Sequence, residues 1–313
     1  MNNCINLPTE KRYKPRSISN FYGSNFIMSK YLELFFIREL QNIYWQHGWI
    51  RKESVLEEDP EVIASEPILN KRNLILVATK DQENFLIRHG FKSKAIGLPY
   101  CYLPEIKIQR KKDTFLIMPV HGSRDLPVIY NENYDSFINK CKELRKSFAI
   151  VDVCMHSEDI KQNNHQVWVR EGFKVIKGAD THDANSLLKM KYLFMQYETV
   201  FSDSIGSHIV YAASSGAKIS LFNEANYKHL IDKNEFYRDK KILKYDPKIY
   251  EFLYCSPLSA KKHKSWAQNE LGFDNMPSKK ELIAILKWNL KNFILDCLMR
   301  LTRKFLRIFF NKD

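Results

Sequence analysis

Two histidine–glycine pairs follow apolar segments that end like buried strands. The first is His47 with Gly48, and the second is His121 with Gly122. An imidazole with an ordinary pKa can take a proton from a hydroxyl group or stabilise a phosphate leaving group. A single histidine is more often a hydrogen-bonded structural residue, but two such pairs at equivalent first strands of successive α/β units would face one cleft. We therefore assign His47 as a base and place His121 at a phosphate.

A turn of small residues follows a later apolar segment that ends at Ser202. It leads into a segment with helical period, and the free N–H groups and positive dipole end of a helix suit a phosphate. Gly206 would let the backbone approach the ligand, and Ser204 and Ser207 would add hydroxyl donors. The alternative is an ordinary capped turn in which Asp203 or Ser204 satisfies the start of the helix.

A third polar segment begins where the predicted strand over residues 173–177 meets Gly178. Its side chains should leave the carboxyl edge of the sheet, where Asp180, His182 or Asp183 could hold a ribose or sugar hydroxyl. Asp183 could equally be a plain N-cap. A further group of possible bases follows His47, although a solvated acidic loop is the simpler interpretation: Glu53, Glu57, Glu58 and Asp59.

Short β-branched or aromatic segments alternate with longer segments of helical period, which is typical of parallel α/β units. In the first part of the chain we expect strands over residues 42–46, 73–79 and 95–99, and helices over 28–40 and 81–89. Asp81 would cap the second helix, and Gly90 would end it.

Beyond a charged stretch at residues 109–113, the alternation repeats. We expect strands over 114–120, 149–155, 173–177, 199–202 and 218–222, and helices over 131–148, 157–170, 183–197 and 206–215. Right-handed crossovers would make this a doubly wound sheet. The sequence therefore predicts an α/β fold with two Rossmann-like domains, 1–112 and 113–275, a cleft between them, and a helical tail over 276–313.

The composition indicates a globular chain with an anionic partner. Of 313 residues, 44% are apolar and 27% charged, and the net charge is +13. Charge alone would allow a nucleic-acid-binding protein, but no helix-turn-helix, zinc-finger or RNP-type signature is present, so we expect no nucleic-acid partner. A dehydrogenase is disfavoured because no G-x-G-x-x-G motif follows a strand.

Cysteine usage and hydropathy indicate a cytoplasmic protein. The six cysteines are scattered without a C-x-x-C pair, which fits a reducing compartment. Residues 1–19 lack the apolar core of a signal peptide, and no uncharged apolar run is long enough to cross a bilayer. We expect a protein that can lie on a membrane without crossing it.

The predicted tail combines an apolar stripe with basic side chains. Apolar residues recur at three- and four-residue steps between residues 279 and 310, and residues 278–313 hold nine Lys or Arg against three Asp or Glu. Such a helix suits an anionic membrane interface. The alternative is a helix packed across the first domain, and we favour a packed first part followed by a lipid-bound part from Leu298 onward.

In their order along the chain, these motifs resemble the GT-B glycosyltransferases of bacterial capsule, O-antigen and lipopolysaccharide gene clusters. They also show a distant likeness to the polymerases that transfer glycerol phosphate in teichoic-acid synthesis. The resemblance covers roughly residues 43–222. It departs from the polymerases at Trp49, where Thr-Pro usually follows His-Gly.

The resemblance implies sugar transfer from a nucleotide-activated donor to a lipid-linked or cell-surface polysaccharide acceptor. Residues 1–112 would hold the acceptor and 113–275 the nucleotide sugar, with no cofactor and no metal; the sequence has no Asp-x-Asp motif. Phosphosugar or glycerophosphate transfer is the alternative. The implied donor-binding set, with His121 beside it, is Gly122, Ser123, Gly178, Asp180, Ser204, Gly206, Ser207 and His208.

Overall fold

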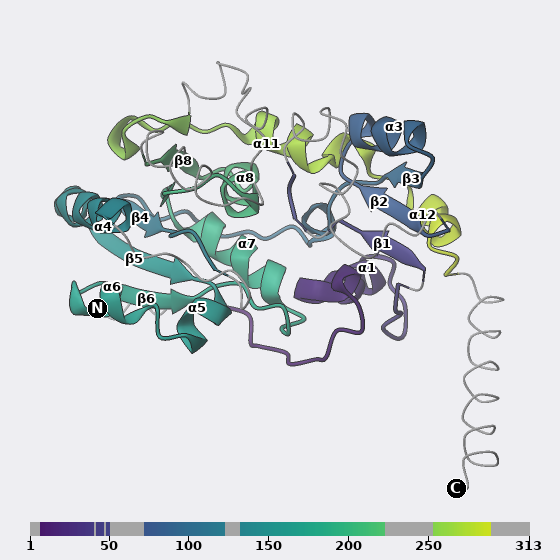
Figure 1. Ribbon diagram of the computed structural model, residues 1–313, viewed down its shortest axis with the longest axis horizontal. Helices are drawn as coiled ribbons and strands as arrows, with labels where there is room; N and C mark the ends of the chain where they lie inside the picture. Colours follow the sequence, from purple (N-terminus) through teal and green to yellow (C-terminus); the bar gives the residue numbers. More distant parts are fainter. Residues whose placement is uncertain are drawn as a thin grey trace, which may run out of the picture.

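A computed structural model of the protein describes residues 7–40, 42–46, 48–50, 72–122, 132–222 and 253–288. These residues form an α/β fold with two parallel sheets. In Figure 1 the larger sheet lies at one end of the molecule and the smaller sheet at the other, with helices α8 and α11 between them. Whether the chain divides into domains near residue 113 stays a prediction.

The smaller sheet has the order β1-β2-β3. Its strands are β1 (Ile43–Trp45), β2 (Leu74–Val77) and β3 (Lys92–Ala95), all parallel. Helix α3 (Lys80–Arg88) joins β2 to β3. Its N-cap is Thr79, which forms a capping box with Gln82, so the prediction of Asp81 as the cap is wrong.

The larger sheet has the order β6-β5-β4-β7-β8. Its parallel strands are β4 (Thr114–Ile117), β5 (Ile150–Met155), β6 (Lys174–Lys177), β7 (Thr199–Ser202) and β8 (Lys218–Leu221). The helices along this part are α4 (Glu132–Leu144), α5 (Ser157–Lys161), α6 (Gln166–Arg170), α7 (Ser186–Gln196) and α8 (Ser207–Ser214).

Alternate residues of the larger sheet face two different cores. Phe115 and Ile117 of β4 join a cluster with Phe137 of α4. Leu116 joins a second cluster with residues of α7 and α8, and that cluster also contains Trp45 of β1. The period-two pattern of the strand thus buries both faces, and one apolar core links the two sheets.

The remaining elements lie in the N-terminal and C-terminal parts of the chain. Helix α11 (Lys264–Leu271) packs on α8, and α12 (Lys279–Ile285) begins with a capping box between Ser278 and Glu281. The others are α1 (Ser24–Tyr31) and the 3-10 helices η1 (Ile18–Gly23), η3 (Pro99–Tyr102), η4 (Arg145–Ser147), η7 (Pro257–Ser259) and η8 (Phe273–Asn275). Among the described helices, none combines the length and apolar character needed to cross a membrane.

Several predicted elements have different bounds in the structure. The helix over 28–40 is wrong, because α1 ends at Tyr31 and Glu33 has φ 57°. The strand over 95–99 is wrong as well, since Gly97 has φ 79° and Pro99 begins a 3-10 turn. The helix over 157–170 is two short helices separated near Asn163, which has φ 63°. The helix predicted over 183–197 begins at Ser186, and the strand predicted over 114–120 ends at Ile117.

Only the first part of the predicted C-terminal helix is described. Helix α12 ends at Ile285, and Lys287, two residues later, has the left-handed φ of 56°. Residues 289–313, which hold most of the predicted basic stripe, lie outside the described part.

Candidate functional site

The larger sheet has a topological switch point between β4 and β7. From β4 the chain builds outward through β5 and β6, and then returns to the other side of β4 to build β7 and β8. Ligands of open parallel sheets bind outside the carboxyl ends of the strands at such a point. His121 follows β4 and the Ser204–Ser207 turn follows β7, so both predicted motifs lie at the switch point.

Asp203 joins the two loops at this point. Its Oδ1 accepts a hydrogen bond from the backbone N–H of Val120 at 2.6 Å. Burial raises the pKa of Asp203 to about 7, although the bond from Val120 acts in the opposite direction. The loop that carries His121 is thereby fixed against the turn that precedes α8.

The carboxyl edge also carries a cluster of imidazoles from three neighbouring strand ends. The ring of His121, which is exposed, stacks on the ring of His156 with 4.8 Å between centroids and 23° between planes. His156 follows β5, and His208 belongs to α8. Burial, helped by the charge of His121, lowers the pKa of His156 to about 4 and that of His208 to about 3. At neutral pH both rings are therefore uncharged.

The contacts of His156 define how its ring is held. Its Nδ1 accepts the backbone N–H of Glu158 at 3.3 Å, which caps the start of α5. The proton of a neutral ring is then on Nε2, which lies 3.4 Å from the hydroxyl of Tyr22. His156 thus presents a fixed tautomer beneath the exposed ring of His121.

The side chain of His208 contacts the turn that precedes α8. Its Nε2 lies 2.9 Å from Oγ of Ser202, and a Cβ atom at Gly206 would lie 3.2 Å from its ring. The lack of a side chain at residue 206 therefore makes room for the imidazole. Among the described residues, no group of three or more His, Cys, Asp or Glu side chains is arranged to hold a metal ion.

The serines of the turn have different surroundings. Ser204 is buried, and its N–H donates to Oγ of Ser202 at 3.2 Å. Oγ of Ser207 accepts the N–H of Trp49 at 2.8 Å, so the chain after β1 reaches the first residue of α8. His47 and Ser123, from the predicted set, lie outside the described residues.

Gly122 lies inside the site rather than on its rim. It is buried, and its N–H donates to Oδ1 of Asp159 at 3.2 Å, an atom that also accepts from Asn164. Burial raises the pKa of Asp159, whose side chain is almost wholly enclosed. This carboxyl group, which the sequence interpretation missed, orients the backbone next to His121.

Asp180 and Gly178 serve the local fold. The carboxylate of Asp180 is 1% exposed and lies 3.1 Å from both Arg12 and Lys177. A Cβ atom at Gly178 would lie 2.6 Å from Sγ of Cys154, so close packing requires glycine there. Asp183 pairs with Lys189 rather than capping α7. We leave Gly178 and Asp180 out of the site proposed below.

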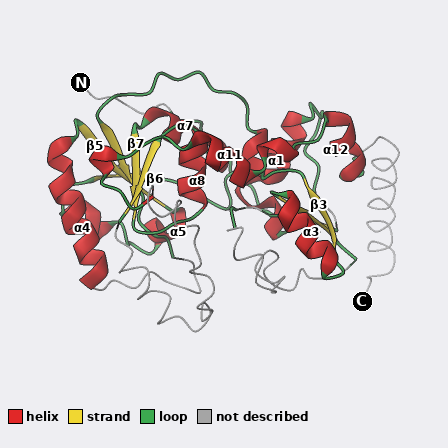
Figure 2. Ribbon diagram, turned by 90° about the horizontal axis from the view of Figure 1, so that it is seen from above, coloured by secondary structure: helices red, strands yellow, loops and turns green. Residues whose placement is uncertain are grey.

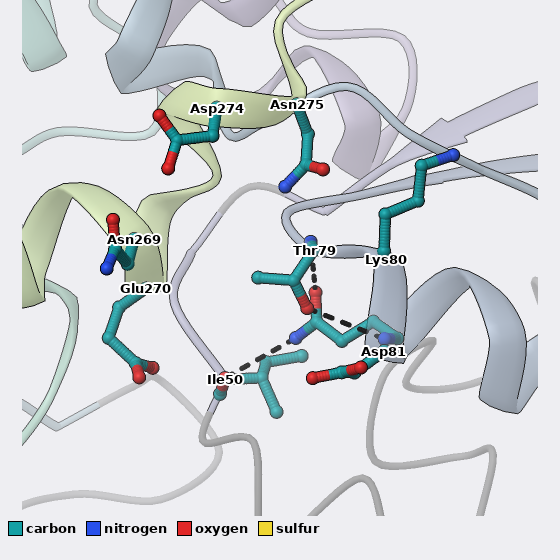
Figure 3. A pocket seen from close by; sticks show the side chains of 9 residues that line it. Ile50, Thr79, Lys80, Asp81, Asn269, Glu270, Asp274 and Asn275 are labelled. Atoms are coloured by element: carbon teal, nitrogen blue, oxygen red, sulfur yellow. Dashed lines mark hydrogen bonds between the residues drawn. The ribbon is translucent and has the colours of Figure 1, made fainter.

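A polar cavity of about 230 Å³ opens at the carboxyl ends of β1 and β2 (Figure 3). Carboxylates and amides predominate on its walls, and the side chains come from the chain after β1, the start of α3, α11 and η8. Trp49 links it to the switch-point site, because its indole N–H donates to Glu270 at 2.8 Å while its backbone N–H binds Ser207. The lining residues are Ile50, Thr79, Lys80, Asp81, Gln82, Asn269, Glu270, Asp274 and Asn275.

No protein-family model matches the sequence, and no curated protein matches it. Among solved structures, one similar chain is a putative UDP-N-acetylglucosamine 2-epimerase from Listeria monocytogenes. The two chains are 12% identical, the match covers 81% of this chain and 72% of the other, and the TM-score is 0.38. A TM-score of this size does not establish a common fold, so the likeness says nothing about what this chain binds.

His156 is the site residue that the sequence interpretation missed despite a readable signal. It directly follows Met155, the last residue of β5, just as His47 and His121 directly follow the strands predicted over 42–46 and 114–120. Applying the same strand-end rule to every predicted strand would have found it.

Proposed function

We propose that the protein is a glycosyltransferase that moves a sugar from a nucleotide-activated donor to a lipid-linked or cell-surface polysaccharide acceptor, at the cytoplasmic face of a membrane. One observation carries the proposal. An exposed histidine and the start of an eight-residue helix share the switch point of a parallel sheet, where ligands of this fold class bind.

The donor phosphates would lie between His121 and the first turn of α8. The N–H groups at the start of α8 point out of the helix and favour negative charge. His121 would add a hydrogen bond to the leaving phosphate, and the neutral rings of His156 and His208 would contribute dipoles without charge. In the reaction the acceptor oxygen bonds to the anomeric carbon, and the bond from that carbon to the phosphate oxygen breaks.

The acceptor would lie on the side of the smaller sheet. The polar cavity there offers carboxylates and amides, which suit sugar hydroxyls. His47, which precedes the Gly48–Trp49 segment that contacts Ser207, would take the proton from the acceptor hydroxyl.

Nucleotide binding gives the first test. Calorimetric titration of the full chain with uridine and cytidine nucleotides and their sugar conjugates should show one preferred ligand. His121→Ala should weaken it at least about tenfold, the loss of one charge-assisted hydrogen bond. The matched control is His89→Ala, because His89 ends α3 and its ring bonds to the carbonyl of Phe85, at the opposite edge of the smaller sheet.

The outcomes separate the candidate functions. Equal affinity in the His121→Ala and His89→Ala variants would count against the proposed donor site. With a bound donor identified, mass spectrometry of the product distinguishes a glycoside from a phosphodiester, and phosphorus in the product would indicate phosphosugar or glycerophosphate transfer instead.

A further inference from the structure

Three consecutive apolar side chains are exposed just after α1. Phe35 is 103% exposed, Phe36 44% and Ile37 42%. The other exposed large apolar residues of the described part, Ile87, Val169 and Leu258, are far apart in the sequence. Single exposed apolar residues need no explanation, but a contiguous group marks a surface that binds a protein or a membrane. We call residues 35–37 the apolar loop.

The base of the apolar loop is fixed to the protein. The N–H of Leu34 donates to the carbonyl of Ser29 at 2.9 Å, and the N–H of Arg38 donates to Oγ of the same serine at 3.0 Å. Leu32 and Leu40, on either side, are buried in the main core. The exposure therefore belongs to a loop with both ends anchored.

Helix α12 flanks the apolar loop at both of its ends. Lys279, its first residue, pairs with Glu33 at 2.6 Å, and the Arg38 guanidinium donates to the carbonyl of Trp288, just beyond its last turn. The Arg38 group also lies over the Trp288 ring at 5.9 Å. Helices α1 and α12 accordingly lie on the same side of the molecule as the smaller sheet (Figures 1 and 2).

The surroundings of the loop are basic. Lys30, Lys280 and Lys287 are exposed, while the carboxylates of Glu33 and Glu281 are bonded to Lys279 and Ser278. The chain that leaves this place after Trp288 contains six Lys or Arg and two Asp. An apolar tip with cationic surroundings complements an anionic lipid surface, in which aromatic side chains enter the acyl boundary and lysines contact the headgroups.

We propose that the apolar loop inserts into an anionic lipid bilayer and holds the protein on the membrane. A second copy of the chain fits less well, since a stable interface needs about 800 Å² per partner and two chains of charge +13 repel each other. The proposed membrane contact does not rest on the proposed transferase activity. It can therefore be tested separately from the nucleotide site.

Vesicle flotation of the full chain tests the loop. The protein should float with vesicles of equal parts phosphatidylcholine and phosphatidylglycerol and should stay behind with phosphatidylcholine alone. The variant Phe35→Ser with Ile37→Ser should lose about tenfold in partitioning. The control variant, Ile87→Ser with Leu258→Ser, removes comparable exposed apolar side chains elsewhere and should float like the unaltered chain.

A second readout places the loop in the lipid. The indole of a Phe35→Trp variant should be quenched by brominated lipid in the mixed vesicles beyond the quenching of the unaltered chain. The proposal is overturned if the unaltered chain does not float with the anionic vesicles, or if the loop variant floats as well as the control variant. It is also overturned if sedimentation shows that the unaltered chain is a dimer and the loop variant a monomer, which would assign the surface to a second copy.

Discussion

The backbone N–H of Trp49 donates a hydrogen bond to Oγ of Ser207 at 2.8 Å. This bond ties the chain after β1 in the smaller sheet to the first residue of α8 in the larger one. A Cβ atom at Gly48 would lie 2.8 Å from the same oxygen, so a side chain there would push the hydroxyl away from this bond. The residue predicted to bind a phosphate thus also fixes how the two sheets meet.

Removing this hydroxyl should loosen the contact between the sheets. Ser207→Ala leaves the N–H of Trp49 without its acceptor, which should lower the free energy of unfolding by about 1–2 kcal/mol. Urea denaturation measures the difference. The matched control is Ser265→Ala, an exposed serine of α11, with an expected change within about 0.5 kcal/mol. Equal stability of the two variants would show that the bond contributes nothing.

Several strands of the larger sheet could be predicted because their sequence pattern is strong. Strands β7 and β8 coincide with or lie within the predicted ranges, since each is a short apolar segment bounded by turn residues. Strand β3 lies earlier in the sequence than the predicted strand over 95–99. Its residues, Lys92–Ala95, are mostly polar and one of them is exposed. A polar, partly exposed strand such as β3 gives little apolar signal, and the prediction took the left-handed Gly97 as part of it.

Other features of the site depend on contacts between segments that are far apart in the sequence. That His121 and the turn before α8 lie at one edge follows from the strand-end rule. The stacking of His121 on His156 and the pairing of Arg12 with Asp180 each join distant segments, and no local pattern encodes them. The apolar loop was hidden inside a predicted helix, because Phe35 fits a helical period as well as an exposed turn.

Gly272 should be far less replaceable than Gly216. Both have positive φ, 78° and 82°, so alanine at either position is strained by about 1 kcal/mol. At Gly272 a Cβ atom would lie 1.9 Å from the carbonyl oxygen of Ala78, whereas at Gly216 the nearest atom is the Arg110 guanidinium at 3.6 Å. Gly272→Ala should therefore lose about 3 kcal/mol or more. Similar urea midpoints for the two variants would contradict the close approach of α11 to β2.

Tyr197 should stabilise the larger sheet through a buried polar contact. Its hydroxyl donates to Oδ2 of Asp152, and both side chains are buried. Tyr197→Phe leaves that carboxylate oxygen without its donor, which should lower the free energy of unfolding by about 2 kcal/mol. Asp152→Leu with Tyr197→Phe removes both polar groups and should lose less than the sum of the two single variants. Strict additivity in this double-mutant cycle would show that the pair is not coupled.

Acid should destabilise the protein through two partly buried imidazoles. The folded pKa values of His156 and His208, about 4 and about 3, lie below the ordinary value of 6.5, so the unfolded chain binds more protons as pH falls from 6.5 toward 3. Asp203 acts in the opposite direction, because its folded pKa of about 7 favours protonation of the folded chain. The two histidines together should lower the stability by more than Asp203 raises it, and water partly screens the charge of the protonated rings. We expect a net loss on the order of 1–2 kcal/mol between pH 6.5 and 4.

Two substitutions separate these opposing contributions. His156→Asn keeps a side-chain acceptor for the N–H of Glu158, and together with His208→Gln it removes both titrating rings. In this variant stability should no longer fall as pH drops from 7 toward 5, and it should rise slightly, because protonation of Asp203 and Asp159 is no longer opposed by the two rings. Urea denaturation across the pH range measures both slopes. An unchanged acid slope in the variant would assign the loss to carboxylates elsewhere, and His156 and His208 would then not be held neutral by burial at the edge of the sheet.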